Sequence, residues 1–171
     1  KPITPTDISI VRQTTIGTQQ KAMPRIFDGA TLYVQNNGKT VREYVYSSSL
    51  EEFTSGAISL ESNHLIDTPV DSAFINALSD RTEQLYFVVN NDGTMALYSS
   101  QRSQKIYGWN LWSTQGSIKS VACTTDNIYI AVSRTINSAT VYYLEQFAST
   151  SFDLPTDMTV TKTLSGSNQP H

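Results

Sequence analysis

The sequence is poor in the residues from which most catalytic and metal sites are built. Its 171 residues include one cysteine, Cys123, and two histidines, His64 and His171. A single cysteine excludes an internal disulfide, and the clusters of cysteine and histidine that bind zinc are absent. The glycines are scattered singly, which excludes a glycine-rich phosphate-binding loop. We therefore expect no catalytic residue, no metal site and no cofactor.

Charge is also scarce and unevenly placed. Charged residues make up 16% of the chain and the net charge is −3, so no overall basic field attracts nucleic acid or anionic lipid. No apolar run reaches the length of about eighteen residues that suggests a membrane span. Residues 51–100, with one basic and eight acidic residues, carry a net charge of −7. The acidic residues Glu51, Glu52, Glu61 and Asp67 are either solvated loop charge or a patch that contacts a basic partner or repels a polyanion.

The clearest pattern in the sequence is a layout shared by three segments, Leu32–Ser47, Leu85–Ser100 and Ile128–Phe147. Each has an apolar and aromatic run, a short polar turn, and a second run that contains tyrosines. Val, Ile, Tyr and Phe favour strands, and Asn-Gly or Asp-Gly supplies the positive φ of tight hairpin turns. The pattern predicts three β-hairpins, with turns such as Asn36-Asn37-Gly38-Lys39.

Further strands are predicted around the hairpins. Alternation of apolar and polar residues indicates strands at Asp7–Thr15, Ser72–Ala77, Ile106–Ser113 and Ile118–Thr124. Both faces of the strand Leu85–Asn90 are apolar, which is typical of a sheet covered on both sides.

Two parts of the chain lack a clear strand pattern. The segment Ser47–Ser62 has irregular apolar spacing interrupted by Gly56, and we expect a long loop with about one turn of helix there. Residues 1–147 form the patterned region, and residues 148–171 are expected to be an irregular C-terminal tail. The first residue is Lys1 rather than methionine, so we expect that a leader or a further domain has been cut away.

The repeat predicts the fold class. The strands from residue 72 to residue 113 form a four-stranded meander, and Ile128 follows Leu85 by 43 residues, a spacing typical of propeller blades. We predict an all-β fold in which antiparallel meanders form a partial or open β-propeller-like domain. Propellers have about four to eight blades, whereas this chain holds roughly three. It is therefore expected not to close a ring alone, and to be monomeric or weakly associated in isolation.

Five segments in order resemble one family. They read VREYVYS, HLIDTPVDSAF, LYFVVNNDGTMALYS, YGWNLWSTQG and RTINSATVYYLEQF, beginning at Val41, His64, Leu85, Tyr107 and Arg134. In this order they resemble the central region of the tail nozzle proteins of short-tailed bacteriophages, also called tail tubular protein B or stabilisation proteins. The resemblance covers roughly Pro5 to Phe147, and residues after Phe147 match nothing in the family. The chain is shorter than such proteins, so the resemblance implies the β-propeller-like region of a larger virion protein.

The resemblance also implies a function. A nozzle protein is a structural component that assembles as a hexamer into the tube through which DNA leaves the capsid, and the family has no catalytic residues. The implied partners are other copies of the full-length protein and adjacent tail proteins. DNA passes without tight binding, and no membrane is involved. The implied location is the virion, in the phage tail, after synthesis in the host cytoplasm.

Other functions are weighed against this one. A glycan- or protein-binding propeller-like module is the main alternative, because the aromatic residues have two interpretations, a stacking surface or ordinary sheet packing. These residues are Tyr33, Tyr44, Tyr46, Tyr86, Tyr98, Tyr107, Trp109 and Trp112. Arg42, beside Glu43 on a strand, is interpreted as a structural hydrogen-bonding residue.

A hydrolase is the more distant alternative. His64 is a candidate base that Asp67 would orient, or that would pair with Cys123 as nucleophile, although a loop histidine and a buried cysteine are the simpler interpretation. Asn90, Asn91 and Asp92 are oxygen ligands in a row, but the closing glutamate of a calcium loop is missing, so we interpret them as a hairpin turn.

Overall fold

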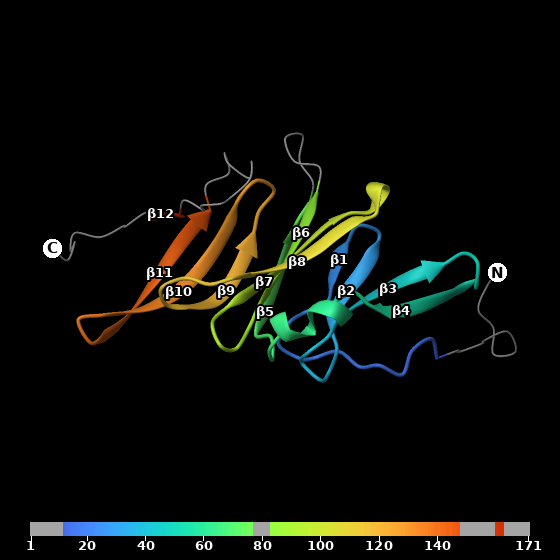
Figure 1. Cartoon of the computed structure of the whole chain (residues 1–171), viewed down its shortest axis with the longest axis horizontal. Helices are drawn as coiled ribbons and strands as arrows, with labels where there is room; N and C mark the ends of the chain where they lie inside the picture. Colours follow the sequence, from blue (N-terminus) through green and yellow to red (C-terminus); the bar gives the residue numbers. More distant parts are fainter. Residues whose placement is uncertain (1–11, 77–82, 148–159, 163–171) are drawn as a thin grey trace, which may run out of the picture.

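The structure, a computed structural model, describes residues 12–76, 83–147 and 160–162, and within them the chain forms three four-stranded antiparallel sheets (Figure 1). The first sheet contains β1 (Arg25–Phe27), β2 (Ala30–Val34), β3 (Val41–Ser47) and β4 (Glu52–Ala57). The second contains β5 (Asp71–Ile75), β6 (Gln84–Val89), β7 (Met95–Gln101) and β8 (Ile106–Trp112). The third contains β9 (Ser117–Cys123), β10 (Ile128–Ile136), β11 (Ala139–Phe147) and β12 (Val160–Lys162). Two short 3-10 helices, η1 (Leu60–Leu65) and η2 (Arg102–Gln104), connect strands.

The sheets lie in a row and repeat one arrangement. In each sheet the order of neighbouring strands follows the order along the chain, so each is a meander. The first strands of successive sheets pack together, β1 beside β5 and β5 beside β9. Figure 1 shows the first and third sheets on opposite sides of the second. The fold is therefore all-β, an open propeller-like array of antiparallel meanders, as the sequence predicts.

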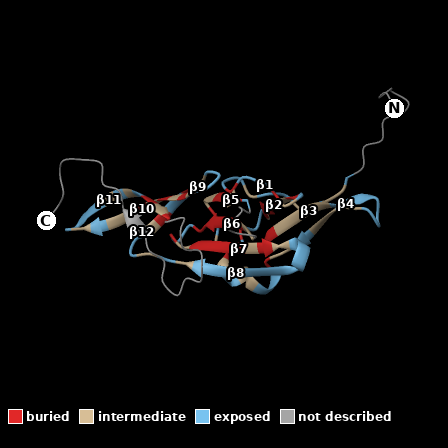
Figure 2. Cartoon of the chain, turned by 90° about the horizontal axis from the view of Figure 1, so that it is seen from above, coloured by how far each residue is buried: buried red, intermediate tan, exposed pale blue. Residues whose placement is uncertain are grey.

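The second sheet supplies the centre of two cores. On β6 the side chains of Leu85, Phe87 and Val89 pack toward the third sheet, and those of Tyr86 and Val88 pack toward the first. All five are at most 3% exposed, and Figure 2 shows buried residues gathered on the middle strands. The prediction that both faces of this strand are covered is thus confirmed. Because alternate residues of a strand point to opposite faces, one apolar strand bridges both cores.

A hairpin turn links each sheet to the segment that leads into the next sheet. The carbonyl oxygen of Gly38 accepts a hydrogen bond from the N–H of Thr68 at 2.8 Å, and that of Gly93 accepts one from Ile118 at 2.9 Å. Both glycines have positive φ. A Cβ on Gly93 would lie 2.8 Å from the Cα of Ser117, so glycine is also required there for close approach.

The region between the first two sheets differs from the sequence-based expectation. The segment Ser47–Ser62, expected to be a long loop, contains β4, which pairs with β3 along its whole length. The alternation of β4 is weak because none of its residues is buried, so no core-facing pattern marks it. The strand β1 is three residues long and was not predicted.

Two expectations about the ends of the described regions are also wrong in part. Of the predicted strand Asp7–Thr15, residues 12–15 are not in a strand, and the rest lies outside the described residues. There the Thr14 hydroxyl accepts a hydrogen bond from the N–H of Ile16, and such local bonds compete with strand pairing. In the tail expected to be irregular, β12 pairs with the edge strand β11, whose backbone groups provide a template for it.

Candidate functional site

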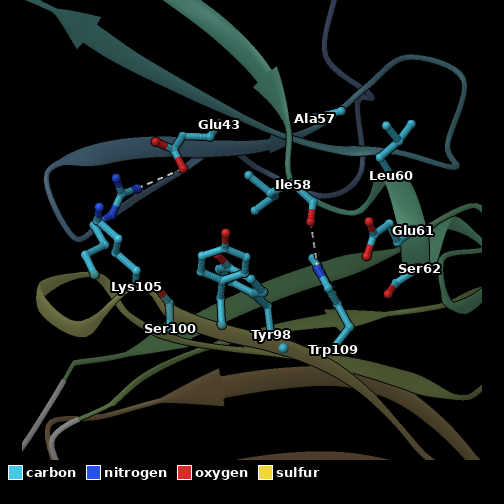
Figure 3. A pocket seen from close by; sticks show the side chains of 13 residues that line it. Glu43, Ala57, Ile58, Leu60, Glu61, Ser62, Tyr98, Ser100, Lys105 and Trp109 are labelled. Atoms are coloured by element: carbon cyan, nitrogen blue, oxygen red, sulfur yellow. Dashed lines mark hydrogen bonds and ion pairs between the residues drawn. The ribbon is translucent and has the colours of Figure 1, made fainter.

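A groove lies between the first and second sheets. Its volume is about 690 Å³. Figure 3 shows side chains from β3, the end of β4, η1, β7 and β8 around it. They include Glu43, Ile58, Leu60, Glu61, Ser62, Tyr98, Ser100, Arg102, Lys105, Tyr107 and Trp109.

An arginine joins the two sheets across one end of the groove. Arg102 on η2 places its Nη2 atom 2.9 Å from Oε2 of Glu43 on β3. Its Nε atom lies 3.1 Å from Oδ2 of Asp28, in the turn between β1 and β2. One guanidinium thus bridges two carboxylates, and a planar fork of donors suits this role. Glu43 is therefore held by Arg102 within the chain.

An aromatic pair forms the floor of the groove. The rings of Tyr98 and Trp109 lie 4.9 Å apart, and the indole Nε1 of Trp109 donates to the carbonyl oxygen of Ile58 at 3.0 Å (Figure 3). Burial raises the pKa of the Tyr98 hydroxyl. Tyr107, by contrast, is 68% exposed on β8. The groove thus has a fixed aromatic floor and one exposed ring.

The groove combines aromatic rings with polar side chains. Its exposed charged groups are Glu61, Arg102 and Lys105, with the serines Ser62 and Ser100 on opposite walls. Aromatic rings beside hydroxyl, carboxylate and ammonium groups suit noncovalent binding of a polar ligand.

The residues weighed for catalysis do not meet in this groove. His64 is exposed on η1, and Cys123 is half-buried at the end of β9 in the third sheet, packed against its core. Neither lines the groove. Asp67 forms an ion pair with Lys39, and the hydrogen bond from Lys39 lowers the pKa of the Asp67 carboxyl. Asp67 is thus engaged with the first hairpin.

The oxygen-rich turn at residues 90–92 has a structural role. The buried Asn90 accepts a hydrogen bond from the N–H of Asp67 and donates to the carbonyl of Leu65, each at 2.9 Å. Asp92 accepts two hydrogen bonds from Thr94. These bonds fit the predicted hairpin turn. Across the described residues, no group of three or more His, Cys, Asp or Glu side chains is placed to hold a metal ion.

Most of the aromatic residues are used in packing. Tyr86 is fully buried, Tyr44 stacks on Phe53 with ring centroids 5.0 Å apart, and Trp112 packs on Phe87 and Phe147. Arg42 donates hydrogen bonds to the side chain and carbonyl of Ser55 and to Gln35. These contacts fit the structural interpretation of Arg42.

The sequence led us to expect the acidic residues on one loop, but the structure places them on different elements. Glu51 precedes β4, Glu52 begins it, and Glu61 lies on η1 beyond its other end. Asp67 follows η1 and is paired with Lys39. The unpredicted strand β4 is the physical reason for this separation. These four acidic side chains are therefore not gathered in one loop.

Sequence reasoning did not predict Arg102 or Lys105 as groove residues. Their polar segment, SSQRSQK, shows no motif, and only the packing of the second sheet against the first reveals their place. Neither of the 3-10 helices in the described regions is long and apolar enough to cross a membrane. No protein-family model and no curated protein matches the chain.

Proposed function

We propose that this chain is a structural component of a phage tail nozzle and that it works by assembly rather than by chemistry. The observation that carries the proposal is the open row of three sheets, in which one turn and one first strand link each sheet to the next. Within the described part of the chain the row does not close, and no other sheet packs on the outer faces of its two end sheets. Such faces favour a role in a larger assembly. The five segments that resemble nozzle proteins support the same role.

The proposed role places limits on charge. A tube that lets DNA pass must not hold it, and acidic side chains repel phosphates whereas basic ones bind them through counterion release. The net charge of −7 in residues 51–100 supports this role. We expect no shift of duplex DNA in a gel at low ionic strength. Tight binding that disappears with added salt would contradict the conduit.

Labelling of the virion tests the location directly. Antibodies raised against this chain are expected to decorate the tail of the parent phage in negative-stain micrographs, below the portal. Particles that lack the portal and tail provide the control and should remain unlabelled. Labelling of the capsid shell would contradict the proposal.

A binding module is the second candidate, and the groove favours it. Tyr107 and the pair of Tyr98 and Trp109 line a hollow of about 690 Å³ with polar walls. In this function a glycan would stack on Tyr107. A glycan array would test this function. Binding that Tyr107→Ala abolishes, and that Ile106→Ala at the exposed neighbouring position leaves unchanged, would support it. An array without hits favours the nozzle.

A further inference from the structure

The outermost strand of the second sheet has a free edge. β8 pairs with β7 along all seven of its residues without a bulge, and nothing in the described part of the chain pairs with its other side. The outermost strands of the other two sheets are engaged at their edges. On β4 the N–H of Phe53 donates to Oε1 of Gln13 at 2.7 Å, and β11 pairs with β12. Of these three strands, β8 is the one whose edge the described residues leave wholly open.

The composition of β8 does not protect this edge. Its sequence, IYGWNLW, has no charged residue and no proline, and five of its seven residues are exposed. Edge strands usually carry a lysine, a proline or a bulge, because their unpaired N–H and C=O groups otherwise recruit further strands. A glycine inside a strand often marks the close approach of another backbone, and a Cβ on Gly108 would meet no atom within 4 Å. These features favour a strand that another polypeptide completes.

One face of β8 opens into the groove between the first and second sheets. Tyr107 and Trp109 line the groove, and Tyr107, which lies opposite Ser100 in the pairing register, is 68% exposed. Directly opposite residues of neighbouring strands point to the same face, and successive residues alternate between faces. A strand added at the edge of β8 would therefore place every second side chain in the groove beside Tyr107.

Two charged side chains of the groove lack a partner in the described part of the chain. Glu61 and Lys105 are exposed, and neither forms an ion pair or a side-chain hydrogen bond there. Figure 3 shows them at opposite ends of the groove, with Tyr98 and Trp109 between them. Lys105 directly precedes β8, and Trp109 donates to the carbonyl of Ile58, just before the 3-10 helix that carries Glu61. The four residues from Lys105 to Trp109 span about 13 Å of strand.

We propose that β8 binds an extended segment of another polypeptide as a fifth strand of the second sheet. The side chains that enter the groove are an acidic residue opposite Lys105, an apolar residue over Tyr107 and a basic residue near Glu61. In an extended segment these are the alternate residues i, i+2 and i+4. A second copy of β8 does not supply this pattern, because β8 has no charged residue. The proposal names a class of partner and does not depend on a role in a phage tail.

Selection from a random library of linear peptides against the 171-residue chain tests the proposal. We expect the enriched peptides to share an acidic, an apolar and a basic residue at alternate positions. An enriched peptide is then synthesised with methyl groups on either of its two alternating sets of backbone nitrogens, and each form is titrated by fluorescence anisotropy. Only one set faces β8, so one form should bind about a hundredfold more weakly and the other nearly as the parent peptide does, because added strands depend on main-chain hydrogen bonds.

Charge reversal tests the role of the two unpaired side chains. Lys105→Glu and Glu61→Lys should each weaken binding about tenfold, because each replaces an attraction by a repulsion. The double variant should regain affinity for a peptide whose acidic and basic residues are exchanged. Lys119→Glu, at an exposed position on β9, is the matched control and should bind as the unaltered chain does.

Four results would overturn the proposal. A selection that enriches no peptide would show that the edge takes no added strand. Equal affinities of the two methylated forms would show that backbone pairing is not used. Binding that neither charge reversal changes would remove Lys105 and Glu61 from the site. Enriched peptides that copy the sequence of β8 would show that a second copy of this chain covers the edge.

Discussion

The substitution Gly93→Ala probes the junction between the second and third sheets. Gly93 lies in the turn between β6 and β7 with φ of 89°, and its carbonyl accepts the hydrogen bond from Ile118. A Cβ at this position would approach the Cα of Ser117 to 2.8 Å, closer than the two atoms can pack. Alanine therefore strains the backbone and also pushes β9 away from the turn.

A second glycine separates these two effects. Gly29, between β1 and β2, has φ of 75° and no atom within 4 Å of an added Cβ. Gly29→Ala should therefore cost only the backbone term of about 1–2 kcal/mol. Gly93→Ala adds an overpacking term of about 1–3 kcal/mol, so we expect a total of about 3 kcal/mol. For a chain of this size that total lowers the melting temperature by about 6–12 °C.

Chemical and thermal unfolding measure the difference. The fluorescence of Trp109 and Trp112 reports on the two faces of the second sheet, since these residues pack against different cores. We expect the free energy of unfolding to fall more for Gly93→Ala than for Gly29→Ala. Equal losses in the two variants would refute the reasoning, because they would show that the turn does not need close approach to β9.

Three further predictions concern single groups. Burial raises the pKa of Tyr86 to about 12, so the contribution of this group to stability is complete below pH 10 and is lost as pH rises toward 12. In Tyr86→Phe the free energy of unfolding should therefore fall less steeply between pH 10 and pH 12, as measured by unfolding curves at alkaline pH. Arg134 pairs with the buried Glu145 at 2.6 Å, so Arg134→Met should cost about 3–5 kcal/mol in urea denaturation, and adding Glu145→Gln should recover part of it. His64→Ala and Cys123→Ser should leave assembly intact, and a chelator should not shift the melting temperature; a drop of several degrees would contradict the absence of a metal.

The hairpins were predictable from sequence because local signals mark them. β6 and the first half of β7 carry apolar side chains on both faces, and the Asp-Gly pair between them supplies the positive φ that the turn requires. The 43-residue spacing was enough to predict sheets of similar size in a row. Element type and repeat length depend on near neighbours in the chain, which a sequence shows directly.

The rest of the structure depends on partners far away in the chain. β4 has no buried residue and is held by pairing with β3, so its own sequence resembles a loop. One end of the groove is formed by the ion pairs of Arg102 with Asp28 and Glu43 in another sheet, and no local motif predicts these ion pairs. Arg25 donates a hydrogen bond to the carbonyl of Ser72, and Asp71 accepts one from the N–H of Val121, each in a neighbouring sheet. No local sequence pattern predicts these contacts.

An electron-microscopy reconstruction of the parent phage particle tests the central claim most directly. The account predicts density for this three-sheet row within the tail tube below the portal, repeated around a sixfold axis. Density for the row in the capsid shell, or its absence from the particle, would contradict the assignment to a tail nozzle.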